Sequence, residues 1–309
     1  MKEFEKITVV VVCDNHYIPM LAVLVKSIEA NLCAASRLDL WIIDDNIAKL
    51  NKGKLEKSIN QKITTIIWQS AKSVIPKGFH LPLDKSTFPL NIYLWYFVPY
   101  FLPKEVSRVL CIDVDMINCR DLTELWKTDL GDKIAGAVID PRVRTFECDW
   151  GGILNFEQLG LNGNSKYFNS GLVLINLQKW RKNDITEKAL TIIEENIDFA
   201  VYPEQYGINI ALHNQWLELN PLWNFFATAT NNTTPYMIHF VDRKPIYDSY
   251  INNPSFKQLF FMYLCQTEWS EFRTISETRR YIKKINNVMY KMLKRIVSFF
   301  IFKPKKTTL

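Results

Sequence analysis

The sequence predicts an α/β fold in which helices flank a mostly parallel sheet. Apolar runs of strand length, rich in β-branched residues, alternate along the chain with stretches of helical character. Aspartates directly follow two of these runs, which is typical of the carboxyl ends of parallel strands. The 309 residues, of which 48% are hydrophobic, are enough to bury a large core.

The elements follow in order from the N-terminus. Residues 7–13 form a continuous apolar run, as expected of a parallel strand buried on both faces. Loop and helix-start signals at 14–19 precede a predicted helix over 20–30. Because ligands bind beyond the carboxyl ends of such strands, we expect Asp14 and Asp113 to share a crevice. Further strands are predicted at 40–43, 63–67, 108–113 and 134–139, and helices at 47–59 and around 93–101.

An apolar run over residues 109–117 contains Asp113 and Asp115, one residue apart. Two like charges inside such a run are costly unless something compensates them. In an extended strand, residues i and i+2 point to the same side, so both carboxylates can share one hard divalent cation. The alternative is that Asp115 begins the next turn and backbone amides cap Asp113.

The composition narrows the class of protein. The six cysteines show no paired short spacing, and the chain does not open with the pattern of a secretory signal, a charged n-region followed by an apolar h-region. We therefore expect reduced thiols in a cytoplasmic protein. The lack of a Gly-x-Gly-x-x-Gly or Walker loop argues against a nicotinamide or P-loop enzyme.

The C-terminal segment 279–309 carries ten Lys or Arg residues and no acid, so the rest of the chain is slightly acidic. Apolar residues recur there at spacings of three and four, namely Ile282, Ile285, Met289, Met292, Ile296 and Phe299. This pattern predicts a basic amphipathic helix that binds an anionic membrane surface through residues 279–306, rather than nucleic acid. The alternative is a terminal helix whose apolar face packs on the body.

Four blocks in the same order resemble family eight glycosyltransferases, and most closely the bacterial lipooligosaccharide galactosyltransferases. They are Cys13-Asp14-Asn15-His16-Tyr17 with Lys26-Ser27-Ile28; Leu110-Cys111-Ile112-Asp113-Val114-Asp115; the segment 167–181; and Ile238-His239-Phe240 with Lys244-Pro245. The resemblance implies a GT-A fold, with a Rossmann-like sheet, over residues 1–255. A C-terminal helical, basic membrane-associating region would follow over residues 256–309.

The resemblance also implies a metal and a donor. Asp113, Asp115 and His239 would bind Mn²⁺ or Mg²⁺, and oxygen ligands with one imidazole suit these ions. Lys244 would reach the donor diphosphate as a point charge. A UDP-sugar donor would contact Asp14, Tyr17, Asp113, Val114, Asn169, Ser170 and Lys244.

The reacting groups implied by the resemblance lie near residue 205. Glu204 would hold sugar hydroxyls, and Gln205 would lie under the anomeric carbon, where an amide can stabilise an oxocarbenium-like state. From the residues alone, Glu204 could simply favour a helix N-terminus. Asp140 would approach the acceptor. The implied activity is retaining, metal-dependent transfer of galactose or glucose from a UDP-sugar to a lipid-linked or surface glycan, on the inner face of the bacterial cytoplasmic membrane.

Three positions depart from the family pattern. Trp95 replaces an Arg that helps hold the donor sugar in relatives, and Trp cannot make its bidentate bonds. Asp242 stands where the family has Gly after His239, and Tyr206 replaces an acid. Two alternatives therefore stay open: a catalytically silent, membrane-tethered module that binds nucleotide sugars, and a metal-dependent phosphohydrolase that uses Asp113.

Overall fold

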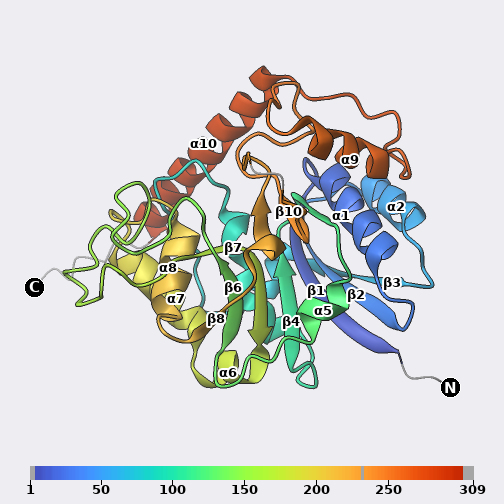
Figure 1. Ribbon diagram of the computed structural model, residues 1–309. Helices are drawn as coiled ribbons and strands as arrows, with labels where there is room; N and C mark the ends of the chain where they lie inside the picture. The colour runs from blue at the N-terminus through green and yellow to red at the C-terminus, as the bar shows by residue number, and fades with distance from the viewer. Residues whose placement is uncertain (1–3, 231–232, 302–309) are drawn as a thin grey trace, which may run out of the picture.

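The computed structural model describes residues 4–230 and 233–301 (Figure 1). Its centre is a seven-stranded sheet in the order β3-β2-β1-β4-β7-β6-β8. Neighbouring strands are parallel, except that β7 is antiparallel to both β4 and β6. The predicted α/β fold with a mostly parallel sheet is confirmed. The strands are β1 (Glu5–Asp14), β2 (Ser36–Asp45), β3 (Thr64–Ser70), β4 (Arg108–Ile112), β6 (Ala135–Ile139), β7 (Phe168–Asn176) and β8 (Trp216–Glu218).

The first strands and helices follow the order expected from the sequence. β1 pairs with β2 along its whole length, so Asp14 and Asp45 end the two strands side by side. β2 extends beyond the predicted 40–43 because its ladder with β1 continues into polar residues at both ends. The helices between these strands are α1 (Ile18–Asn31) and α2 (Lys49–Ser58), which lie on the right of Figure 1.

A second, three-stranded sheet brings a distant segment to the end of β4. It consists of β5 (Met116–Asn118), β10 (Met237–His239) and β9 (Phe225–Phe226), in the order β5-β10-β9. β10 is antiparallel to β5, and His239 lies opposite Met116. Asp113 and Asp115 lie in the turn between β4 and β5 rather than in one extended strand, so the predicted strand geometry was wrong at this point.

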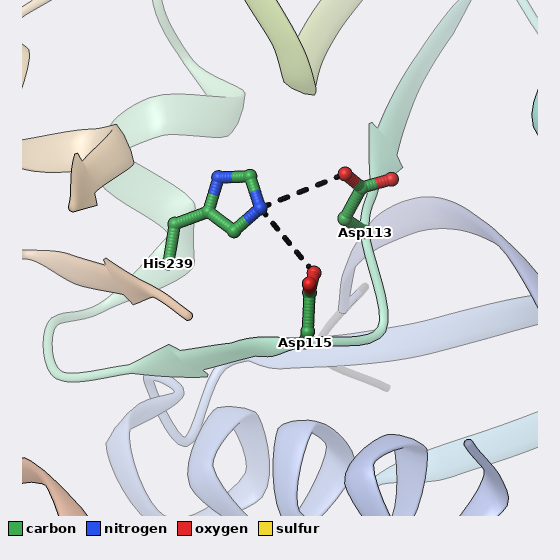
Figure 2. A group of neighbouring side chains, drawn as sticks. All are labelled: Asp113, Asp115 and His239. Carbon is green, nitrogen blue, oxygen red and sulfur yellow. Dashed lines mark ion pairs between the residues drawn. The ribbon is translucent and has the colours of Figure 1, made fainter. Parts of the chain in front are cut away.

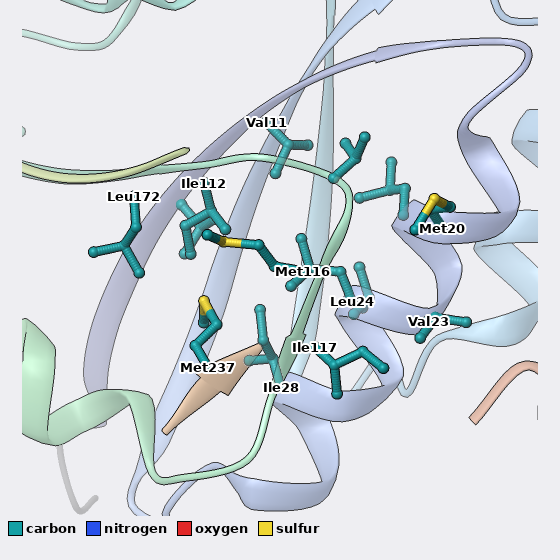
Figure 3. Packing of buried hydrophobic residues seen from close by; sticks show 14 of the residues in the cluster. Val11, Met20, Val23, Leu24, Ile28, Ile112, Met116, Ile117, Leu172 and Met237 are labelled. Carbon is teal, nitrogen blue, oxygen red and sulfur yellow. The ribbon is translucent and has the colours of Figure 1, made fainter. Parts of the chain in front are cut away.

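Hydrophobic cores fill both faces of the large sheet. One core packs α1, β5, β10 and α9 against alternate residues of β1, β2 and β4. Figure 3 shows part of this core, where Leu24 of α1 lies near Met116 and Ile117 of β5. The other core packs the segment 90–98 and the helices after β7 against the opposite face. The buried layers hold the ends of β1, β4 and β7 rigidly in one place.

The other helices are mostly short. The helix expected around 93–101 is instead a 3₁₀-helix, η1, followed by a short α-helix. Pro99 lies in the first turn of that α-helix, where its missing N–H breaks a continuous helical ladder. The helices between β3 and β9 are α3 (Ala71–Val74), η1 (Leu90–Phe97), α4 (Val98–Phe101), α5 (Leu122–Trp126), α6 (Leu177–Lys182), α7 (Ile185–Glu195), α8 (Pro203–Ala211) and the 3₁₀-helix η2 (Pro221–Asn224).

The C-terminal part contains α9 (Pro254–Leu264) and α10 (Glu277–Ile301). α9 packs against α1, and Phe260 and Leu264 belong to the same core as β1. The core of the sheet therefore continues past residue 255, where the sequence suggested a boundary. α10 runs along the upper left of Figure 1, away from α1 and α2. Among the helices that the structure describes, none is both long and apolar enough to cross a bilayer.

Candidate functional site

A cavity of about 780 Å³ opens beyond the carboxyl ends of β1 and β4, which pair directly. It is lined by segments that follow β1, β4, β6 and β10, by the start of β7 and α8, and by α10. The predicted crevice shared by Asp14 and Asp113 is therefore present. The site residues predicted from the sequence all line it: Asp14, Tyr17, Asp113, Val114, Asp115, Asp140, Asn169, Ser170, Glu204, Gln205, His239 and Lys244.

Asp113, Asp115 and His239 form a compact cluster in this cavity (Figure 2). His239 Nε2 lies 3.7 Å from an oxygen of Asp113 and 3.3 Å from an oxygen of Asp115. Three potential ligand atoms, one from each residue, lie within 4.8 Å of one another. Asp113 opens toward the cavity, with 58% of its side chain exposed, whereas Asp115 is 11% exposed. One face of the cluster is therefore free to admit a cation and a ligand.

A chain of amides sets the orientation of the His239 ring. His239 Nδ1 lies 2.8 Å from Asn224 Oδ1, and Asn224 donates from its own amide nitrogen to Asn169 Oδ1 at 2.8 Å. Since the Asn224 oxygen can only accept, Nδ1 carries the proton and the lone pair of Nε2 faces the two aspartates. Metal-binding histidines are held in this way. The donor set therefore fits a divalent metal that prefers oxygen with one imidazole.

Gly171 explains why β7 can pass so close to this cluster. A Cβ atom at this position would lie 2.5 Å from His239 Cε1 and 3.0 Å from Asp113 Oδ2. The Asp113 N–H also donates to the carbonyl of Gly171 at 2.8 Å, which ties the end of β4 to β7. A side chain at position 171 would therefore collide with His239 and crowd Asp113.

Lys244 places a positive charge beside the two aspartates of the cluster. Its ammonium group forms an ion pair with Asp115 and donates to the carbonyl of Phe240 at 3.1 Å. Burial alone would raise the pKa of Asp115, but Lys244 and His239 hold it well below its usual value. Asp115 is therefore a carboxylate at neutral pH, as a metal ligand must be.

Glu204 and Gln205 begin α8 and meet the start of β7. Gln205 Oε1 accepts from Asn169 Nδ2 at 2.9 Å and from the Ser170 N–H at 3.1 Å, so the amide is fixed in one orientation. The Glu204 carboxyl accepts from Trp95 Nε1 at 2.9 Å and from Ser170 Oγ at 2.8 Å. Burial raises the pKa of Glu204 to about 8. Trp95 thus replaces the expected arginine with a single neutral hydrogen bond.

The other two departures have structural explanations. Asp242 adopts a left-handed backbone conformation, with φ of 61°, which is the conformation that glycine favours. Its carboxylate turns to Arg142, which donates to both oxygens at 3.0 and 2.6 Å. Tyr206 is fully buried and donates to Asn155 at 2.6 Å, outside the cavity. Asp242 therefore brings no unpaired negative charge to the metal cluster.

Asn224, Arg142 and Lys283 contribute to the site but were not predicted from the sequence. Asn224 carries no local signal, because an isolated amide before an aromatic strand has many structural roles. Arg142 lies two residues after Asp140, and only the fold brings it to Asp242. Lys283 lies within the basic C-terminal segment, whose helical pattern did not reveal which side faces the body. It forms an ion pair with Asp14.

An acidic and imidazole cluster of this kind, in a cleft at the strand ends of an α/β sheet, is typical of enzymes that bind a phosphorylated substrate through a metal. The family model of glycosyl transferase family 8 matches residues 8–246. The chain therefore belongs to glycosyl transferase family 8.

Curated relatives come from bacteria and animals. General stress protein A of Bacillus subtilis (strain 168) is 25% identical over 290 residues, which cover 87% of this chain and 97% of that protein. Glycosyltransferase GlyB of Streptococcus pneumoniae serotype 4 is 27% identical over 279 residues. That match covers 84% of this chain but only 61% of GlyB.

Solved structures share the fold. Galactosyltransferase LgtC, in complex with donor and acceptor sugar analogs, superimposes with a TM-score of 0.68 at 22% identity. The match covers 89% of this chain and 99% of LgtC. The bifunctional glycosyltransferase WbbM in its apo form gives a TM-score of 0.72 at 18% identity, over 86% of this chain and 51% of that one. The expected GT-A fold is thereby confirmed.

Proposed function

We propose that the protein is a retaining glycosyltransferase that moves a hexose, galactose or glucose, from a UDP-sugar to a lipid-linked or surface glycan. The observation that carries this proposal is the cluster of Asp113, Asp115 and His239 in the central cavity. Mn²⁺ or Mg²⁺ would be held by these three residues. When bound, it would supply a Lewis acid that neutralises charge on the departing nucleoside diphosphate.

The donor lies across the cavity in this proposal. Its nucleoside contacts Asp14 and Tyr17 after β1, its diphosphate lies by the cluster and Lys244, and its sugar reaches Asn169 and Ser170. The ion pair of Lys244 with Asp115 supports this arrangement, because it places an ammonium group beside the cluster. A point charge on a flexible stem can follow the diphosphate as the bond to the sugar breaks.

Gln205 and Glu204 act on the sugar. The Gln205 amide oxygen already accepts hydrogen bonds from β7. Its dipole is therefore fixed before the reaction, which favours stabilisation of an oxocarbenium-like state over nucleophilic attack. Glu204 binds a sugar hydroxyl beside Trp95 and Ser170. Asp140, which accepts from Asn169 Nδ2 at 3.0 Å, orients the acceptor.

The acceptor lies at a membrane surface in this proposal. α10 exposes an apolar face to solvent although its polar face packs on the body, with the side chains of Tyr281, Ile282, Ile285, Met289, Tyr290, Met292, Leu293, Ile296 and Val297 all at least half exposed. Exposed cations at Arg279, Lys284 and Lys294 flank this face. Apolar burial together with basic flanks is the combination that binds an anionic leaflet. The protein would act from the cytoplasmic face.

A panel of nucleotide sugars tests the catalytic proposal. The protein is incubated with each sugar, with manganese or with chelator, and nucleotide release and binding are followed. Release of UDP from one donor, dependent on metal, is the expected result. Binding without release would favour the silent binding module, and release of inorganic phosphate would favour the phosphohydrolase. No binding of any UDP-sugar would refute the proposal.

Flotation with vesicles of anionic phospholipid tests the membrane proposal. The double variant Ile285→Glu, Met289→Glu places two acids on the exposed face of α10 and should lose vesicle binding. Leu50→Glu is a matched control, since Leu50 is a 73% exposed apolar residue on α2. Equal flotation of both variants would contradict the assignment of α10.

A further inference from the structure

α10 packs on the body through one polar stripe of its surface. The stripe consists of Lys283, Asn287, Lys291 and Arg295, at spacings of four residues. Each donates to the body: Lys283 to Asp14, Asn287 to the carbonyl of Thr87, Lys291 to Asp84 and Arg295 to the carbonyl of Leu83. The polar stripe therefore lies inward and the apolar face lies outward.

The position of α10 is set by a buried ion pair. Lys291 Nζ lies 2.7 Å from Asp84, and their side chains are 3% and 0% exposed. Tyr93 of η1 donates to the second oxygen of Asp84 at 2.8 Å. A charge pair so well buried and hydrogen-bonded cannot exchange with water at low cost. The backbone of α10 is therefore held over the cavity by the fold itself.

Lys283 binds the carboxylate oxygen of Asp14 that, among the described residues, accepts no backbone hydrogen bond. Asp14 Oδ1 accepts the N–H groups of His16 and Tyr17 at 2.9 and 3.0 Å. Lys283 binds the other oxygen, Oδ2. The ammonium group also lies over the Tyr17 ring, 4.9 Å from its centroid. One lysine thus takes both the hydrogen-bonding atom and the aromatic face that a nucleoside would use.

We propose that Lys283 is an internal competitor for the nucleoside subsite, and that α10 thereby lowers the affinity of the protein for its donor. This inference rests on the proposed function, which places the nucleoside at Asp14 and Tyr17. The base can stack on Tyr17 and donate an N–H to Asp14 only when the ammonium group has left both. The flexible stem of lysine allows that exchange while Lys291 keeps α10 in place.

The competition has a defined thermodynamic consequence. The apparent dissociation constant of the nucleoside equals the intrinsic constant divided by the fraction of molecules in which Lys283 has left the subsite. Neutral uridine isolates this effect, because it carries no phosphate that the lysine could attract. UDP carries the base, which competes with Lys283, and also the diphosphate, which the charge of Lys283 attracts. Comparison of uridine with UDP therefore separates these two effects of Lys283.

The experiment uses the full chain and two variants. Lys283→Met keeps the apolar stem and the helix propensity but removes the charge. Lys294→Met is the matched control, since Lys294 lies on the exposed side of α10, where its ammonium group lies 5.0 Å from the Tyr290 ring centroid. Uridine binding is measured by NMR titration and UDP binding with MnCl₂ by calorimetry. Amide hydrogen exchange over 283–295 reports whether α10 stays docked.

Lys283→Met should bind uridine roughly threefold to tenfold more tightly than the wild type, with α10 protection unchanged, because a partly buried ion pair no longer opposes binding. Lys294→Met should match the wild type. Unchanged or weaker uridine binding by Lys283→Met would overturn the proposal that Lys283 competes with the nucleoside. If the wild type still bound UDP in that case, the proposed function would stand. Tighter binding with loss of α10 protection would overturn the assignment to Lys283. Failure of every protein to bind UDP would overturn the proposed function itself.

Discussion

The cluster of Asp113, Asp115 and His239 and the ion pair of Lys283 with Asp14 lie in one cavity, but they are built in opposite ways. Asp113, Asp115 and His239 come from short segments tied together by backbone hydrogen bonds, and amide side chains orient the imidazole. Lys283 reaches the cavity from the surface of a helix, on a long flexible side chain. The first region is preorganised for one ligand geometry, whereas the second can change its partner without any change of fold.

Loss of a proposed metal ligand should have the largest effect. Asp115→Asn removes one carboxylate of the cluster and the ion-pair partner of Lys244. We expect turnover with a UDP-sugar to fall by about a thousandfold or more, since the charge on the leaving group would no longer be neutralised. Initial rates at saturating Mn²⁺ measure the loss. Asp39→Asn, a surface carboxylate on β2 paired with Lys6, should retain the wild-type rate; similar losses in both variants would refute the role of Asp115.

Removal of the buried anchor of α10 should have the next largest effect. Lys291→Met leaves Asp84 without its cation in a site from which water is excluded. We expect a local loss of stability of about 3 kcal/mol, because an unpaired buried charge is costly. Hydrogen exchange should show loss of protection over 283–295 with little change in β1 and β4. Uniform loss of protection across the sheet would instead mean that α10 supports the whole fold.

The double variant Asp84→Asn, Lys291→Met gives the matching control. It removes both charges and leaves a neutral amide that Tyr93 can still bond. Its α10 should regain part of the protection lost in Lys291→Met, because the penalty comes from the unpaired carboxylate rather than from the lost attraction.

Gly171→Ala should produce a smaller but more specific effect on the preorganised region. The added methyl group would lie 2.5 Å from His239 Cε1 and 3.0 Å from Asp113 Oδ2, so the imidazole must shift from its place in the cluster. We expect Mn²⁺ affinity to fall by about 10-fold to 100-fold, together with a loss of stability of about 1 to 3 kcal/mol from the overpacked contact. Titration with Mn²⁺ followed by water proton relaxation measures it. Gly53→Ala on α2, where an added Cβ meets nothing within 4 Å, should bind Mn²⁺ like the wild type.

The two regions also differ in how far the sequence predicts them. Asp113 and Asp115 could be predicted from the residues, because Asp113 follows a strand-like run and strand ends meet at one edge of the sheet, whereas His239 came only from the family resemblance. Asn224 could not, since its role depends on the side-by-side placement of η2, β7 and β10, which no local pattern encodes. The helical period of α10 could be seen in the sequence. Amphipathic spacing alone, however, does not tell whether the apolar face of a helix packs on the body or faces water.

Substitution of Glu204, the buried carboxyl beside the proposed sugar subsite, should have the smallest effect, and that effect depends on pH. The pKa of Glu204 is about 8 in the folded protein, against an ordinary value of 4.5. Between these values the folded state keeps a proton that the unfolded state has lost. The free energy of unfolding should therefore fall as pH rises from 4.5 to 8 and then level off.

Glu204→Gln removes this titration while keeping the size of the side chain; its amide oxygen can still accept from Trp95, and its amide nitrogen can donate to Ser170 Oγ. Every other carboxyl is present in both proteins, so the difference between their unfolding free energies isolates Glu204. We expect the variant to gain about 1 to 3 kcal/mol relative to the wild type between pH 5 and pH 9, as measured by urea unfolding. Parallel curves would mean that Glu204 stays ionised on the side of the cavity where the hexose is proposed to bind. In that case a carboxylate, rather than a neutral carboxyl, would meet the sugar hydroxyls beside Trp95.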